Sequence, residues 1–262
     1  MREIVFNEIE QIENILASKN AENVSIKQLL MLLVKYTYPN SGELSVKKYK
    51  RNIQDKVLTL KMQDGYEEYL YDSYIEKLCR NIKNGKLNKE LKNITKIDIT
   101  KKEMNIVKQG ITDREKKLLF TLFVLAKSIL VPTGWVNYED NQILQYGNLK
   151  GCRKTDYYLM IHKLYKKGLM DFNHKIDSPG LKVELQDDLD NVEICITNFK
   201  NFGNQCLSYL KPGWKMCENC GRMIKVGNNK QKYCKKCAIE VEAKNKSIRN
   251  KKMYQNKKNS AK

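Results

Sequence analysis

No apolar run in this chain of 262 residues is long enough to cross a bilayer. The most apolar stretch, residues 118–131, covers only about 14 residues and contains Lys127, so it is better interpreted as a buried helix. The first residues are acidic and periodic, whereas a signal peptide combines a basic start with an apolar run. These absences predict a cytoplasmic protein with no membrane partner.

Catalytic signatures are also missing. The sequence contains no P-loop glycine pattern, no H-E-x-x-H and no G-x-S-x-G. Its two histidines, His162 and His174, are more typical of surface or hydrogen-bonded positions than of catalytic bases. The acidic segment 187–190 would suit a metal-dependent nuclease, but three carboxylates in one loop are more typical of a solvated turn. The sequence therefore predicts a protein that is not an enzyme.

Acidic residues are scarce near the C-terminus, where positive charge accumulates. The whole chain carries a formal net charge of +19, and residues 211–262 hold 16 Lys or Arg against 3 Glu. A solubilising surface would account for a mild excess of lysine, but an excess at one end predicts attraction to a polyanion, most often nucleic acid.

Four of the eight cysteines form two C-x-x-C pairs, Cys217 with Cys220 and Cys234 with Cys237, separated by 13 residues. Such spacing lets each tight turn present two sulfurs to one ion, and four thiolates leave no open position for a reacting water. In a chain with reduced thiols, the pattern predicts one structural Zn²⁺ rather than disulfides. Segments 223–226 and 230–233 are expected to pair as a hairpin between the two turns, with a helix following Cys237.

The periodicity of apolar residues predicts a mainly α fold with a small β component. A helical N-terminal domain should cover residues 1–110, and its acidic first helix is a candidate for homodimer formation. A turn is expected at residues 39–42 because Pro, Asn, Ser and Gly follow one another there. A linker over 201–215 should lead to a treble-clef or ribbon-like zinc finger over 216–243, and then to a basic tail over 244–262 that frays towards its end.

Residues 111–200 follow the order of a winged helix-turn-helix. The pattern predicts a long helix from a capping box at Thr112, a helix over 138–146, a helix over 153–167, and strands at 169–174, 181–185 and 192–197. In such domains the second helix of the pair enters the DNA major groove. The predicted nucleic-acid contacts lie at the start of that helix and in the basic tail: Lys150, Arg153, Lys154, Tyr158, Lys244, Lys246, Arg249, Lys251 and Lys252.

Residues 217–224 (CENCGRMI) and 232–238 (KYCKKCA), followed by a Lys-rich helix, resemble the C-terminal finger of a family of phage and mobile-element proteins of low-GC Gram-positive bacteria. The opening MREIV, residues 99–103 (ITKKE) and residues 134–137 (GWVN) are also similar. The resemblance implies an origin and a layout, and it supplies no activity.

These observations predict a zinc-containing duplex-DNA-binding protein of phage or mobile-element origin, acting in transcriptional regulation or DNA replication. RNA is the alternative polyanion. Two other classes remain open. One is an adaptor that binds a host protein and whose basic tail is only solvated, and the other is a nuclease or nucleotidyl-transfer accessory that uses the acidic loop near Asp187.

Overall fold

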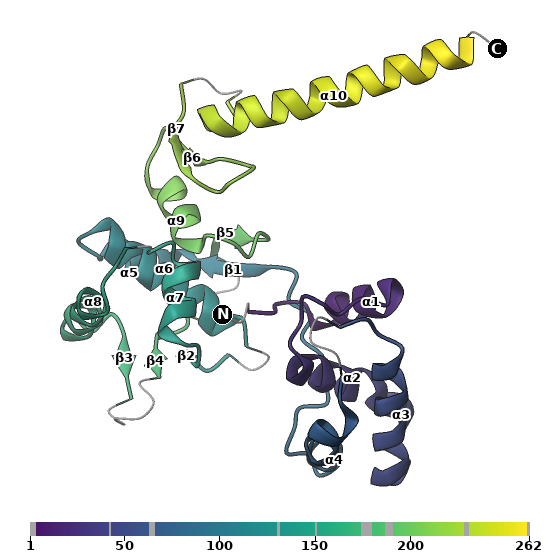
Figure 1. Ribbon diagram of the computed structural model, residues 1–262. Coiled ribbons are helices and arrows are strands. Elements are labelled where there is room, and N and C mark those ends of the chain that lie inside the picture. The colour runs from purple at the N-terminus through teal and green to yellow at the C-terminus, as the bar shows by residue number, and fades with distance from the viewer. Residues whose placement is uncertain are drawn as a thin grey trace. The chain divides into compact units, whose positions relative to one another are not determined.

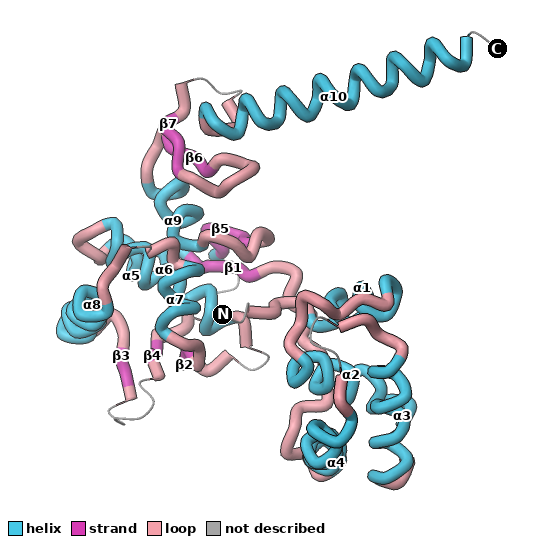
Figure 2. The backbone as a smooth tube through the Cα atoms, viewed as in Figure 1, coloured by secondary structure: helices cyan, strands magenta, loops and turns pink. Residues whose placement is uncertain are grey.

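The computed structural model describes residues 4–41, 43–62, 66–129, 132–149, 151–173, 180–186, 191–227 and 231–260, with side chains described as far as Met253. Its described part is mainly helical with short strands, as the apolar periodicity predicts (Figures 1 and 2). Contacts divide the chain into two compact units, residues 3–95 and 96–262. No described helix combines the length and apolar character that crossing a membrane requires.

The first unit is a group of helices around a leucine-rich core. Its helix α2 contacts the other three, and Leu29, Leu30 and Leu33 on α2 are fully buried. Inside the unit, the Lys35 ammonium lies 2.9 Å from a Glu8 carboxylate oxygen, and the Lys92 backbone N–H donates to the same oxygen. The helices are α1 (Glu8–Ser18), α2 (Ile26–Ser41), α3 (Val46–Leu58) and α4 (Glu68–Lys83).

The prediction of a turn at residues 39–42 is wrong, because α2 continues through Pro39 to Ser41. Tertiary contacts outweigh the local turn signal at this point. Ser41 is buried, and its hydroxyl oxygen accepts a hydrogen bond from the Asn52 side chain on α3 at 3.2 Å. Packing therefore extends the helix by almost a turn beyond the position that composition indicates.

The second unit is built around helix α6 (Asp113–Lys127), whose residues 118–126 are all buried. Strand β1 (Ile97–Thr100) and helix α5 (Lys101–Lys108) pack on α6, and β1 pairs antiparallel with β5 (Val192–Ile196). Both helices begin with capping boxes, at Thr100 and at Thr112, and the second of these is the one expected above from the sequence. The contacts thus place residues 96–110 in the second unit, whereas the expected domain boundary lies at residue 110.

A three-stranded sheet lies beside α6. Strand β2 (Trp135–Val136) follows α6, and the chain continues through α7 (Asp140–Tyr146) and α8 (Lys154–Lys166) to β3 (Asp171–Phe172) and β4 (Leu181–Lys182). The strand order is β2-β4-β3, all antiparallel. Two residues of pairing are too short to give a periodic signal, so β2 was not predicted. The strand expected at 192–197 is β5, which joins β1 instead of this sheet.

The segment expected as a linker over 201–215 carries helix α9 (Phe202–Leu210). Phe202, Cys206 and Leu207 are buried, and α9 packs against α6. The reason is the helical spacing of these three apolar side chains, which the surrounding Asn and Gly residues obscure.

The last elements are β6 (Trp214–Met216), β7 (Met223–Lys225) and α10 (Lys235–Ser260). The prediction that residues 223–226 pair with residues 230–233 is wrong, because β7 pairs with β6 instead (Figure 2). Trp214 lies opposite Lys225 and Met216 opposite Met223, so the first C-x-x-C pair lies in the connection between the two strands. Helix α10 begins two residues before Cys237 and continues to Ser260.

Candidate metal centre and nucleic-acid interface

The first C-x-x-C pair lies in a tight turn between β6 and β7. The Cys217 backbone N–H donates to the Arg222 carbonyl at 2.8 Å, and the Gly221 N–H donates to the Cys217 carbonyl at 2.8 Å. Gly221 has a φ of 67°, a conformation that glycine adopts at little cost. The second pair spans the start of α10, where the Ala238 N–H donates to the Cys234 carbonyl at 2.9 Å.

These turns bring the four predicted ligands together. The sulfurs of Cys217, Cys220, Cys234 and Cys237 all lie within 4.8 Å of one another, and none is in a disulfide. The Cys220 and Cys234 sulfurs are 3.9 Å apart. A disulfide needs about 2.05 Å, whereas a tetrahedral site with metal–sulfur bonds of about 2.3 Å has sulfurs about 3.8 Å apart. The four cysteines are positioned to bind a metal ion.

The electrostatics of the cluster point the same way. Burial raises the pKa of Cys217, but backbone N–H donors from Cys234, Cys220 and Asn219 outweigh burial and lower the pKa to about 6. The Asn219 side chain lowers the pKa of Cys237, but burial and the neighbouring sulfurs outweigh it and raise the pKa to about 12. Adjacent thiolates repel one another, so four can coexist only around a cation.

No family model matches the chain, and neither the curated proteins nor the solved structures contain a match. Function is therefore inferred from the geometry of the cysteines and from the distribution of charge.

The predicted contacts at the start of α8 lie on its solvent side. Arg153 is the N-cap residue, its side chain is 82% exposed, and its guanidinium donates to the Asp156 carboxylate at 3.2 and 3.4 Å. The Lys154 ammonium lies 5.6 Å from the centre of the Tyr158 ring. The Tyr158 hydroxyl donates to Asp140 at the start of α7 at 2.8 Å, which fixes the ring.

The opposite side of α8 is the inward stripe that the sequence predicts, because Tyr157, Ile161 and Leu164 are buried. Lys163 and Lys166 lie on the solvent side and were not among the predicted contacts. A search for exposed cations along the whole helix, instead of in its first turn only, would have added Lys163 and Lys166 to the candidate contacts. Lys150, His174 and the acidic segment 187–190 lie outside the described residues.

The predicted tail residues are carried by α10. The helix has 26 residues, so it extends over about 39 Å. No acidic residue follows Glu242 in the sequence. The predicted cations are all exposed: Lys244, Lys246, Arg249, Lys251 and Lys252.

Proposed function

We propose that the cysteine cluster holds one structural zinc ion and that the protein binds duplex DNA. Four sulfur ligands suit Zn²⁺, and a centre with four protein ligands has no open position for chemistry. The small core around it supports a folding role for the ion. It consists of Cys217, Cys234, Cys237 and Ile224, with Tyr233 packed against them, so little apolar area stabilises this region without a metal.

We also propose that α6, α7, α8 and the β2-β4-β3 sheet form a winged helix-turn-helix. Three features support this assignment: the order of the elements, the short strand between α6 and α7, and the pairing of that strand with the β3–β4 hairpin. In this assignment α8 is the recognition helix, and β3–β4 is the wing.

The observation that carries the DNA proposal is the exposed positive charge on two separate elements. Arg153 and Lys154 start α8, and α10 presents cations with no acid beyond Glu242. Arg153 would read a base edge, because its planar fork can grip guanine O6 and N7, whereas lysines supply charge to phosphates. The role that fits is transcriptional regulation or replication-associated binding, in a protein of phage or mobile-element origin.

The test compares variants on a duplex selected from random sequences and on a scrambled duplex. Arg153→Ala should cost about 1–3 kcal/mol on the selected site and little on the scrambled one. Lys154→Ala should weaken both by similar factors, because a phosphate contact carries no sequence information. Lys47→Ala, an exposed cation on α3, is the matched control and should bind like the parent. If Arg153→Ala binds both duplexes like the parent, α8 is not the recognition helix.

A further inference from the structure

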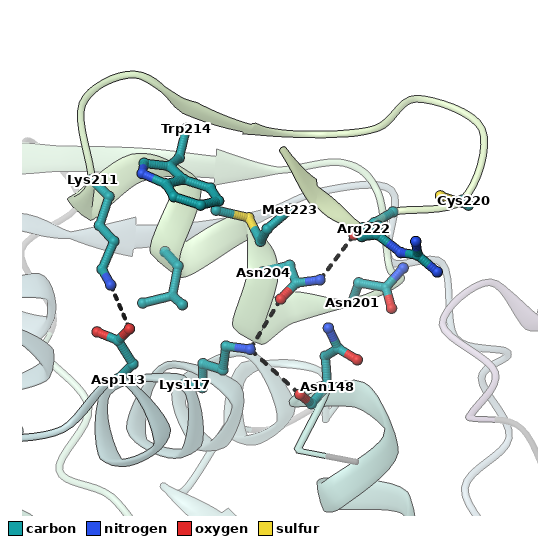
Figure 3. Close-up of a pocket in the computed structure, with 12 residues that line it drawn as sticks. Asp113, Lys117, Asn148, Asn201, Asn204, Lys211, Trp214, Cys220, Arg222 and Met223 are labelled. Carbon is teal, nitrogen blue, oxygen red and sulfur yellow. Dashed lines mark hydrogen bonds and ion pairs between the residues drawn. The ribbon is translucent and has the colours of Figure 1, made fainter. Parts of the chain in front are cut away.

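A cavity of about 580 Å³ lies between α6, α9 and the turn that holds the first cysteine pair (Figure 3). Small-molecule sites occupy about 300–1,000 Å³, so the cavity is large enough for a ligand of that size. Its walls come from segments far apart in sequence, because Lys117, Asn148, Asn204 and Arg222 all face it.

Lys117 forms the floor of the cavity. Its ammonium donates to the Asn204 side-chain oxygen at 3.1 Å and to the Asn148 carbonyl at 3.4 Å. Asn204 is buried, and its amide nitrogen donates in turn to the Gly221 carbonyl at 2.8 Å. These bonds join α6, α9 and the cysteine turn into one polar network, drawn as dashed lines in Figure 3.

The residues that line the cavity carry more positive charges than negative charges. Lys211 is paired with Asp113, the one acid among the lining residues. Among the described residues, no carboxylate lies within ion-pair distance of Lys117 or Arg222. Burial lowers the pKa of Lys117, and the charge of Asp113 only partly opposes this effect. A bound anion would stabilise the part-buried Lys117 ammonium, and the exposed Arg222 would supply a second cation to it.

The upper wall of the cavity is apolar and aromatic. Trp214 is 40% exposed and lies beside Met223 (Figure 3), and Leu207 also lines the cavity. A partly exposed indole offers a flat face on which a planar ring can stack. The side-chain amides of Asn148 and Asn201 add donors and acceptors to the lining.

Close packing shows that the cavity is built into the fold. A Cβ at Gly203 would lie 1.9 Å from the Gly147 carbonyl oxygen, so α9 lies directly against the end of α7. A Cβ at Gly221 would lie 2.2 Å from the Asn201 side-chain nitrogen. Asn148 and Asn201 both have positive φ, at 49° and 54°, and asparagine tolerates this conformation better than most residues.

We propose that this cavity binds one unpaired nucleotide, with its base stacked on Trp214 and its phosphate held by Lys117 and Arg222. Cations for a phosphate, an aromatic face for a base and amides for the base edge are the groups that recognise such a unit. The bases of an intact duplex are stacked inside it, so this site is separate from the duplex contacts proposed for α8 and α10. The unit is either a free nucleoside monophosphate or one nucleotide of a single strand.

The experiment titrates the zinc-loaded full chain with the four deoxynucleoside 5′-monophosphates, the matching nucleosides, inorganic phosphate and short single-stranded deoxyoligonucleotides. Binding is measured by calorimetry and by quenching of tryptophan fluorescence. A monophosphate or an oligonucleotide should bind about tenfold more tightly than a nucleoside or inorganic phosphate and should quench Trp214. Affinity for the monophosphate alone identifies a free nucleotide as the ligand, and affinity for the oligonucleotide alone identifies a strand.

Two variants link the binding to the cavity. Trp214→Ala and Arg222→Gln should each weaken it about tenfold, and Trp214→Phe should restore most of the affinity because a ring is still present. Lys101→Gln, an exposed cation at the start of α5 outside the cavity, is the control and should bind like the parent. Both Trp214→Ala and Arg222→Gln should retain duplex binding, which separates this proposal from the previous one. Failure of both probes to exceed inorganic phosphate, or unchanged affinity in both variants, would overturn it.

Discussion

At the residue scale, the four cysteine sulfurs set the chemistry of the C-terminal region. Backbone donors lower the pKa of Cys217. Burial and the neighbouring sulfurs raise the pKa of Cys237, so the two thiols are shifted in opposite directions. A divalent ion reverses that balance because it attracts every thiolate at once. A bound divalent ion would therefore stabilise this small core.

Replacing Cys234 with Ser should abolish stoichiometric zinc and unfold the segment around β6 and β7, while the core around α6 stays folded. Zinc per chain is measured by elemental analysis. Tryptophan fluorescence then reports the change at Trp214, in β6, against Trp135, in β2. Cys195→Ser, which changes an exposed cysteine outside the cluster, should keep its zinc. A chain with all four cluster positions changed to Ser that still holds one zinc would contradict the assignment.

At the scale of helices and strands, the sequence predicts features that depend on neighbouring residues, but it does not predict pairings between distant segments. The capping boxes at Thr100 and Thr112 set the starts of α5 and α6, because each is complete within four residues. The pairing of β1 with β5 joins strands more than 90 residues apart, and no local pattern encodes it. The same reason explains the cavity, because Lys117, Asn204 and Arg222 meet only through tertiary packing. The metal ligands were predictable because their spacing is itself the motif.

Packing of α9 should be sensitive to a single methyl group. Gly203→Ala would place a Cβ 1.9 Å from the Gly147 carbonyl oxygen, so α9 would have to move away from α7. We expect the free energy of unfolding of the second unit to fall by about 1–3 kcal/mol. Both tryptophans lie in this unit, so urea denaturation followed by tryptophan fluorescence reports it selectively. Gly227→Ala, whose added Cβ meets only the end of Gln231 at 3.6 Å, is the control, and equal stability of the two variants would contradict the packing.

The start of α6 should depend on its cap. The Thr112 hydroxyl accepts from the Glu115 N–H at 3.2 Å, and the Glu115 carboxylate accepts from the Thr112 and Ile111 N–H groups at 3.1 and 2.7 Å. Thr112→Ala should lower the free energy of unfolding by about 1 kcal/mol in the same fluorescence assay. Thr133→Ala, in an exposed loop, should change it by less than about 0.5 kcal/mol. An unaffected Thr112→Ala variant would show that the cap adds nothing to the packing of α6.

At the scale of the whole molecule, the buried core and the excess of positive charge lie in different parts of the chain. Nearly all of the described buried apolar side chains lie before residue 211, whereas residues 211–262 hold 16 Lys or Arg against 3 Glu. α10 carries much of this charge and has few buried positions. In the proposed DNA complex, this basic helix would contact phosphates, and each phosphate contact would release counterions from DNA.

The most direct test of DNA binding is the salt dependence of duplex affinity, measured for the full chain and for a chain ending at residue 243. Each phosphate contact contributes about 0.9 to the slope of log affinity against log salt. The truncation removes eight Lys or Arg, so it should reduce the slope by as much as about 7.2, and selected and scrambled duplexes should weaken by similar factors. Replacing the five predicted tail cations with Gln in the full-length chain should reduce the slope by as much as about 4.5. An unchanged slope in both the truncated and the Gln-substituted chains would contradict the account.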